Sequence, residues 1–448
     1  MDKNKATLEL GSKPVGKLLM QYALPAIIAM TASSLYNMVD SIFIGQGVGA
    51  LAISGLAVTF PFMNLSAAFG AGVGVGSSSY LSVKLGQRDY STAQRILGNN
   101  ITLNILIGFI CSVVSLIFLD PILYFFGASD QTIPYAREYM IIILLGNIIT
   151  HLYFGMNAVL RAASKPRQAM YTTIFTVVLN SILDPLFIYT FDMGIRGAAI
   201  ATILSQTVAL AWQTRLFSDK GELLHLKRGI YRLDNIIVKN ILGIGISPFA
   251  MNATACLVAI FVNQRLLEYG GDLAVGAFGI ANRVAFIFIM INFGVNQGMQ
   301  PIAGYNYGAQ NYDRLMRVLK LAMIAGTCVT TSGFIVAEFM PHLCVRLFTN
   351  DKVLTDLAVN GIRIMMAAMP IVGYQMIVTN FFQSIGKAKI SIFLSLSRQL
   401  LFLVPLIGVM PLFFGVNGVW VAMPISDSFS AIFALVMMVR YMRVFKKR

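Results

Sequence analysis

The sequence predicts an all-α polytopic membrane protein, with twelve transmembrane helices in two six-helix lobes related by a parallel internal repeat. Hydrophobic residues make up 57% of the 448 residues and charged residues only 12%, whereas a soluble domain carries about 25% charged residues. Mean hydropathy is +0.73. The second half of the chain also resembles the first, which indicates a duplicated architecture.

Runs of about 20 apolar residues, enough to cross a bilayer as a helix, predict twelve spans. They lie at 18–44, 52–80, 96–119, 136–158, 168–190, 195–217, 240–266, 274–303, 316–340, 357–382, 391–413 and 417–441. The first run is too long for the apolar core of a signal peptide and is expected to stay as a helix. The expected domains are an N-terminal lobe at 1–217, a linker at 218–239 and a C-terminal lobe at 240–448.

The placement of the basic residues predicts the topology. Net charge is +15, and most Lys and Arg residues lie at the N-terminus and in every second loop. This positive-inside pattern places both termini in the cytoplasm of a cell-membrane protein. We interpret the basic linker as a topology determinant beside anionic lipid rather than a nucleic-acid site. The four cysteines show no CxxC spacing and the three histidines are scattered, so no metal site is expected from them.

An internal repeat appears with a shift of 222 residues: segment 86–95 parallels segment 308–317, with Gly, Tyr and Arg at matching positions. Further pairs follow this shift, the last with a slip of one residue: Gly72 and Gly294, Gly76 and Gly298, Pro25 and Pro248. Each half carries six predicted spans, so both halves start on the same side. Such parallel repeats are typical of transporters whose lobes rock around a central site. The alternative is a duplication that only builds a stable bundle.

Two aspartates, Asp40 and Asp184, lie inside predicted spans. An aspartate at a helix centre costs about 2.5–3.5 kcal/mol on insertion scales, so an intramembrane acid usually marks an ion or substrate path. Under the repeat, Asp40 corresponds to Asn263 and Asp184 falls near Leu406. The sequence therefore predicts cation chemistry in the N-terminal half only. The alternative is that both acids simply hydrogen-bond to pack their helices.

Further oxygen ligands surround these acids in the sequence. Asn180 and Asp184 are four residues apart and share a helix face. Pro185 removes a backbone hydrogen bond and leaves the Ser181 carbonyl free, and Thr202 in the sixth span adds a hydroxyl. The predicted cation site consists of Asp40, Asn180, Asp184 and Thr202, with Tyr36, Asn37 and Pro185 in support. These oxygens suit Na+, and two neighbouring buried carboxyls equally suit a proton.

The second half holds other polar residues in apolar spans. Asp427 is interpreted as structural, because the adjacent serines and Pro424 can satisfy it locally. Arg283 and Arg398 either contact an anionic group of a substrate or bond to helix carbonyls, and with Gln383 they are the residues proposed for a substrate cavity. The 24 Met and 31 Phe suit an adaptable cavity, since flexible thioethers and rings repack around varied ligands.

Taken together, these features resemble the multidrug and toxic compound extrusion (MATE) family over nearly the whole chain. The resemblance rests on the two six-span lobes and on Pro25, Asp40, the Gly86 and Gly308 loops, segment 160–166 and Asn180/Asp184-Pro185. It implies antiport, with export of organic cations driven by inward Na+ or H+. In the branch with acids in the N-terminal lobe, the family's cation site matches Asp40, Asn180, Asp184 and Thr202. Another branch carries acids in spans seven and ten, where this sequence has none.

The sequence therefore predicts a cation-coupled antiporter, not an enzyme, that exports amphipathic, cationic drugs or toxic metabolites by alternating access. We expect a monomer in the lipid bilayer with small-molecule substrates and no cofactor other than the coupling ion, H+ or Na+. One alternative is a flippase for lipids or lipid-linked oligosaccharides, which needs cations facing its cavity. A remote alternative is an intramembrane aspartyl protease, although its acids follow different neighbours.

Overall fold

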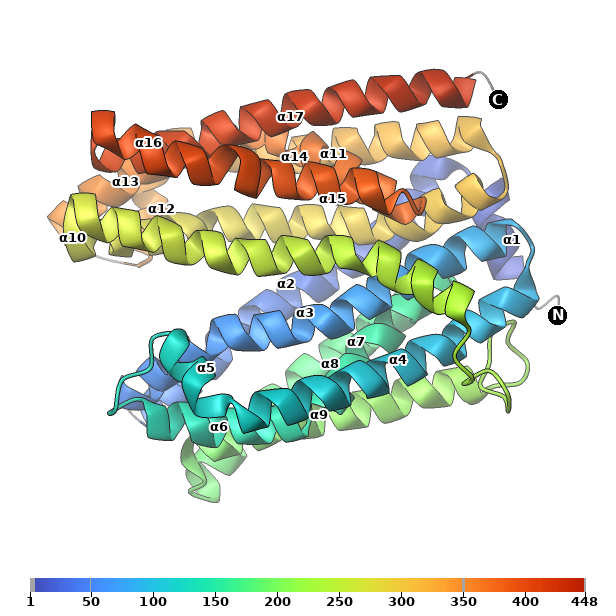
Figure 1. Ribbon diagram of the computed structural model, residues 1–448, viewed down its shortest axis with the longest axis horizontal. Helices are drawn as coiled ribbons and strands as arrows, with labels where there is room; N and C mark the ends of the chain where they lie inside the picture. The colour runs from blue at the N-terminus through green and yellow to red at the C-terminus, as the bar shows by residue number, and fades with distance from the viewer. Residues whose placement is uncertain (1–4, 49, 349–350, 447–448) are drawn as a thin grey trace. The chain divides into compact units, whose positions relative to one another are not determined.

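The computed structural model describes residues 5–48, 50–348 and 351–446, and every regular element in these ranges is helical. At positions 5, 36–42, 45–47, 50, 51, 53, 54, 57, 272 and 444–446 the backbone alone is described. The elements of Figure 1, in which η marks a π-helix, are α1 Lys5–Ser12, α2 Val15–Gly47, α3 Ala50–Gly86, α4 Tyr90–Ile117, α5 Leu119–Phe125, α6 Ile133–Leu145, α7 Asn147–Ala162, α8 Pro166–Pro185, η1 Leu186–Thr190, α9 Gly194–Ser218, α10 Asn235–Gly308, α11 Tyr312–Phe339, α12 Pro341–Arg346, α13 Lys352–Met366, α14 Met369–Ser384, α15 Ala388–Leu396, η2 Ser397–Leu403, α16 Val404–Phe414 and α17 Val416–Lys446.

The predicted membrane spans are confirmed, although two of them are bent. Ten helices in the described ranges are long and apolar enough to cross a membrane, and counting each bent helix pair as one span gives twelve. The bent pairs are α6 with α7, at 56°, and α13 with α14, at 50°. They fall on the predicted spans 136–158 and 357–382. The seventh and eighth spans are the two parts of α10, which breaks at Gly271, where φ is +67°.

The chain forms two compact units, each with its own buried hydrophobic core. The first unit consists of Ile28–Asn252 with the residues up to Lys13, and the second consists of Pro14–Ile27 with the chain from Ala253 onward. The divisions fall inside α2 and α10, so each of these helices contributes its start to one unit and its remainder to the other. The lobe boundaries at 217 and 240 come from the repeat and stay a prediction.

The repeated glycines are positions of close helix packing. A Cβ added to Gly72 of α3 would lie 2.9 Å from the carbonyl oxygen of Gly245 in α10, within the first unit. A Cβ added to Gly294 of α10 would lie 2.6 Å from Cα of Ile27 in α2, within the second unit. Small residues let membrane helices approach this closely. The 222-residue shift therefore pairs glycines with the same packing role in each unit.

A buried polar seam joins α3 and α7 in the first unit. The hydroxyl of Ser66 donates to Oδ1 of Asn147 at 3.1 Å, and Nε2 of His151 donates to the Ser66 carbonyl at 3.0 Å. A Cβ on Gly70 would lie 2.8 Å from Cα of His151. All three polar side chains are buried, so their hydrogen bonds to one another fix the register of the two helices without contact with lipid.

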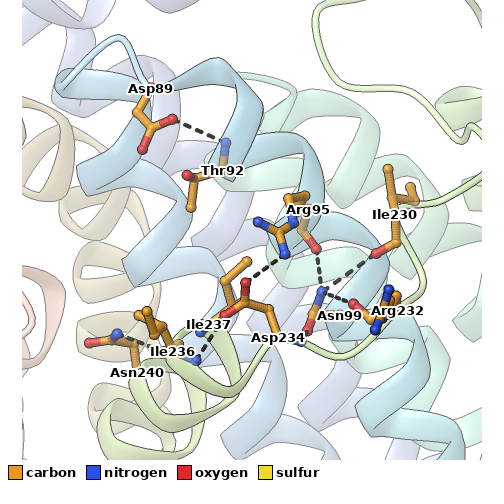
Figure 2. A network of polar contacts seen from close by, with 10 residues as sticks. All are labelled: Asp89, Thr92, Arg95, Asn99, Ile230, Arg232, Asp234, Ile236, Ile237 and Asn240. Carbon is orange, nitrogen blue, oxygen red and sulfur yellow. Dashed lines mark hydrogen bonds and ion pairs between the residues drawn. The ribbon is translucent and has the colours of Figure 1, made fainter.

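The linker between α9 and α10 is attached to the start of α4 by a polar network, shown in Figure 2. Nη2 of Arg95 lies 2.5 Å from Oδ2 of Asp234. Nδ2 of Asn99 donates to the Arg232 carbonyl at 3.2 Å, and Oδ1 of Asn99 accepts from the Asp234 amide at 3.0 Å. Because Asp234 also accepts the Ile236 amide at 2.8 Å, it caps the N-terminus of α10. The network thus fixes where α10 begins.

We expect Gly294→Ala to lower the thermal unfolding midpoint in detergent, because its methyl group would clash with the α2 backbone and overpacking costs about 1–3 kcal/mol. The matched control is Gly279→Ala, at a helical position of α10 where an added Cβ meets nothing within 4 Å. That variant should match or exceed the parent, since alanine favours helix by about 1 kcal/mol over glycine. Equal midpoints for the two variants would contradict the packing role.

The Asp234 carboxylate, which caps α10, makes the protection of nearby backbone amides from hydrogen exchange depend on pH. Hydrogen bonds from the Ile237 and Ile236 amides, with the Arg95 charge, lower the pKa of Asp234 below its ordinary value of 3.8. Its stabilisation is therefore present above pH 3.8 and lost as pH falls through the lowered pKa. We expect amide hydrogen exchange across 234–240, corrected for the intrinsic rate, to show this loss. Asp234→Ala should lack protection already at pH 6, whereas Asp219→Ala, elsewhere in the linker, should retain it.

Candidate functional site

A stripe of polar residues runs along one face of α8. Thr172, Thr176, Asn180 and Asp184 follow one another at intervals of four residues, so they lie on one face about one turn apart. Thr172, Asn180 and Asp184 are buried. Nε2 of Gln213 in α9 donates to the Thr172 hydroxyl at 3.3 Å, which ties the stripe to the neighbouring helix. The stripe therefore faces the inside of the first unit rather than lipid.

The start of α8 is positioned by α7. Nδ2 of Asn157 donates to the Ala169 carbonyl at 3.0 Å and lies 3.2 Å from the hydroxyls of both Thr172 and Thr173. Arg161, one turn further along α7, donates to Oδ1 of Asn157. The side chain of Asn157 is thus fixed from both sides, and this fixes the rotation of α8. Asn157 was not predicted, although it lies one turn before Arg161 of segment 160–166.

Asn180 and Asp184 form the centre of the site. Nδ2 of Asn180 donates to Oδ1 of Asp184 at 2.9 Å, and the two residues are 1% and 0% exposed. The two residues therefore lie on one helix face, as their spacing predicts. An amide that donates to a carboxylate leaves its own carbonyl oxygen as an acceptor, so the pair offers several oxygen atoms in a water-poor interior. Such a group can hold a proton or a small cation.

The helix changes its hydrogen-bond spacing directly after Asp184. Pro185 ends α8, and η1 follows with the amide of Phe191 bonded to the Leu186 carbonyl at 3.0 Å, five residues back. π-Helical turns inside α-helices frequently mark functional sites. The sequence predicted the interruption at Pro185 but not that the chain would continue as a π-helix.

The helix that carries Asp40 lies beside η1. The hydroxyl of Tyr189 donates to the Phe43 carbonyl at 3.1 Å, and the two rings meet edge to face at 6.5 Å. Phe43 is three residues after Asp40 in α2. The side chains of Asp40, Tyr36 and Asn37 lie outside the described residues, so their part in the site stays a prediction. The backbone nevertheless brings their segment close to the turn that follows Asp184.

Thr202 occupies α9, which packs against both α8 and η1. Its hydroxyl donates to the Ala198 carbonyl at 3.1 Å, within its own helix. This bond is local, so Thr202 as a ligand stays a prediction. No group of three or more His, Cys, Asp or Glu residues suited to a metal occurs in the part of the chain that the structure describes.

The second unit contains an ion pair that sequence reasoning did not find. Nε of Arg398 donates to Oδ1 of Asp427 at 2.7 Å. The local partners expected for Asp427 bond elsewhere, because Ser426 donates to the Arg398 carbonyl and Ser428 donates to the Pro424 carbonyl. The expectation of local satisfaction was therefore wrong. The partners are 29 residues apart on different elements, and no sequence period links them.

The other residues proposed for a substrate cavity are not brought together by any described contact. Gln383 is buried in α14, whereas Arg283 is exposed on α10. Their proposed role in substrate binding stays a prediction.

The two halves of the chain also match one family description separately. The model described as MatE matches residues 25–186 and again residues 246–407. The chain belongs to the MATE family. The two matches confirm the internal repeat, and the membrane-spanning helices agree with a MATE transporter of two lobes. MATE transporters are not enzymes, which removes the aspartyl protease alternative.

Similar proteins cover nearly the whole MATE chain. The multidrug export protein MepA of Staphylococcus aureus strain N315 is 27% identical over 94% of this chain and 93% of its own. A multidrug resistance MATE transporter of the MOP superfamily, solved in an outward-facing conformation, is 25% identical with a TM-score of 0.93 and 98% coverage of both chains. A MOP superfamily transporter from Pyrococcus furiosus, described as having a binding pocket of reversed polarity, is 25% identical with a TM-score of 0.92 and the same coverage.

We expect Asn180→Ala to destabilise the protein by about 1–3 kcal/mol, because Asp184 would lose a buried hydrogen-bond donor. Thermal unfolding in detergent measures this effect. The control is Ser181→Ala on the next position, whose half-buried hydroxyl bonds only to the Val177 carbonyl at 2.9 Å in its own helix. The control should change stability by less than about 1 kcal/mol. A loss no larger for Asn180→Ala than for Ser181→Ala would show that the contact with Asp184 contributes little.

Proposed function

We propose that this MATE transporter is a cation-coupled antiporter, which exports amphipathic, cationic drugs or toxic metabolites across the cell membrane by alternating access. The observation that carries the proposal is the buried contact between Asn180 and Asp184 inside a membrane span. An intramembrane acid is retained at a cost of about 2.5–3.5 kcal/mol. The names of the MepA relatives, multidrug export proteins, support the export of drugs.

The coupling ion is H+ or Na+, and Asp184 is its main ligand in this proposal. Asn180 orients the carboxylate and supplies its own carbonyl oxygen. Asp40 and Thr202 complete the shell, and Pro185 contributes by freeing the Ser181 carbonyl. A bound cation neutralises the buried carboxylate, so ion binding stabilises whichever conformation encloses the site. Substrate binding favours the other conformation, and the two affinities are coupled through that equilibrium.

The flippase alternative is less well supported. A carrier of lipid-linked pyrophosphates needs cationic side chains that are available to the phosphate groups, but the charge of Arg398 is neutralised by Asp427. Substrate does not follow from fold alone, and the Pyrococcus furiosus transporter is described as having a pocket whose reversed polarity suggests a different function.

Both termini lie in the cytoplasm, as the distribution of Lys and Arg indicates. The protein acts as a monomer, because the duplicated halves supply both lobes that alternating access needs.

Efflux of a fluorescent cation from proteoliposomes, under an imposed Na+ gradient and then under a pH gradient, tests the proposal and identifies the ion. We expect Asp184→Asn and Asp40→Asn to lower gradient-driven efflux by about tenfold or more, since losing about 1.4 kcal/mol of binding changes affinity tenfold. Asp356→Asn, an exposed position on α13, is the matched control and should transport normally. Unimpaired gradient-driven efflux in both site variants would refute the assignment.

A further inference from the structure

The Arg398–Asp427 ion pair lies within two membrane spans. Arg398 is in η2, near the middle of the span Ala388–Phe414, and Asp427 is near the middle of the span Val416–Arg443. Figure 1 shows α15, η2 and α16 following one another alongside α17. Removing two charges from water costs several kcal/mol each even after relaxation, and their attraction need not repay it. A contribution to folding stability therefore does not by itself explain why the protein has this ion pair.

The pair is partly accessible. The Arg398 side chain is 30% exposed and the Asp427 side chain 12% exposed. A charge at this depth that faced lipid would be strongly unfavourable, so charged residues inside spans face the interior of a bundle or a water-filled space. This rule favours an arrangement in which the exposed parts of the guanidinium and the carboxylate face such a space rather than lipid.

The geometry of the contact favours release of the Arg398 guanidinium from the Asp427 carboxylate in exchange for another cation. The bond runs from Nε to Oδ1 and does not use the bidentate arrangement in which two parallel nitrogens hold both carboxylate oxygens. Asp427 is short and belongs to a continuous helix, whereas Arg398 is long and can move its charge away while its stem stays packed. The hydroxyl of Ser426 donates to the Arg398 carbonyl at 2.6 Å, so the backbone stays fixed when the side chain moves.

Aromatic rings border the same helix contact. Phe402, one turn after Arg398, stacks on Phe429 of α17 with ring centroids 5.4 Å apart, and it also meets Phe433 at 5.5 Å. Phe393 extends this cluster to 6.0 Å from Phe433. Ring faces carry negative potential and attract cations, an effect of about 0.5–2 kcal/mol. Rings on the same two spans as the ion pair suit an organic cation better than an inorganic ion or an anion.

The repeat separates this pair from the site in the first half. Under the 221-residue shift of the two family matches, Arg398 corresponds to Val177 and Asp427 to Gln206. These positions are about one turn from Asn180 and Thr202. The second half therefore carries its charges next to the repeat equivalents of the cation-site positions, and it carries a pair rather than a lone acid.

We propose that Asp427 is a recognition residue for organic cations, with Arg398 as the internal counter-ion that an incoming substrate cation displaces. This inference rests on the proposed export of cationic compounds and names the residue that selects them. The substrate's ammonium, phosphonium or aromatic cation takes the place of the guanidinium at Asp427, and its apolar part packs on Phe402 and Phe429. The coupling ion and the substrate then use different acids, Asp184 and Asp427.

Equilibrium binding to the purified protein in detergent, at constant pH and without an ion gradient, tests this directly. The probe is radiolabelled tetraphenylphosphonium, and tetraphenylborate is an anion of the same shape. Because Arg398 competes with the probe, Arg398→Gln should bind tetraphenylphosphonium about tenfold more tightly than the parent. Asp427→Asn should bind it about tenfold more weakly, and the double variant should match Asp427→Asn. Asp427→Glu should retain binding.

A purely structural ion pair predicts a different pattern. Both single variants would then lose thermal stability and probe affinity together, and the double variant would recover both; that result overturns the proposal. Tetraphenylborate binding that depends on Arg398 would overturn it as well. Where Arg398→Gln fails to fold because it leaves a buried charge, Arg398→Lys replaces it. Lysine keeps the charge but loses the Nε contact, so tighter probe binding is again expected, and unchanged binding counts against competition.

One further variant separates this inference from the proposed coupling mechanism. Asp184→Asn should bind tetraphenylphosphonium like the parent in the gradient-free assay, while it loses gradient-driven export. If Asp184→Asn exports normally, the coupling assignment fails, and the recognition role of Asp427 is still decided by the binding data. If binding does not depend on Asp427, the recognition role fails, and the coupling assignment is still decided by transport.

Discussion

The structure depends on the absence of water from the hydrocarbon core of the membrane, which requires every polar group in a span to find its partner inside the protein. Helices satisfy this for the backbone, and the side chains solve it in two ways. Asp184 is fully buried and receives a neutral amide from Asn180. Asp427 is partly accessible and receives a charge from Arg398. The two acids therefore sit in different surroundings, one beside an amide and one beside a guanidinium.

The same requirement explains why both polar centres adjoin π-helical turns. A proline or an added residue disturbs the regular hydrogen-bond spacing, and the displaced carbonyls need new donors. After Pro185 the Phe191 amide reaches back five residues to Leu186. At η2 the Arg398 carbonyl accepts the Ser426 hydroxyl from the neighbouring helix. One residue of each turn is buried, Ile188 in η1 and Ser397 in η2.

Features with a short sequence period were predictable and features between distant segments were not. Apolar runs identified all twelve spans, and the four-residue spacing of Asn180 and Asp184 placed them on one helix face. The bends that divide α6 from α7 and α13 from α14 escaped prediction, because they occur within continuous apolar runs. The partner of Asp427 escaped for another reason: its neighbouring serines offered a local solution, and the competition between local and distant partners is decided by packing.

The duplication also shows which positions tolerate divergence. Gly72 and Gly294 are equivalent in the repeat, and each removes a Cβ that would collide with a neighbouring helix of its own unit. Helices that approach this closely leave no room for a side chain at these positions, so both halves keep glycine there. A buried polar group can be stabilised by different partners, provided that each charge is compensated, and the two halves use different polar residues. A scaffold with repeated packing and unrepeated charges leaves room for the proposed coupling ion in one half and the proposed substrate cation in the other, because the two polar centres differ while the glycine contacts are shared.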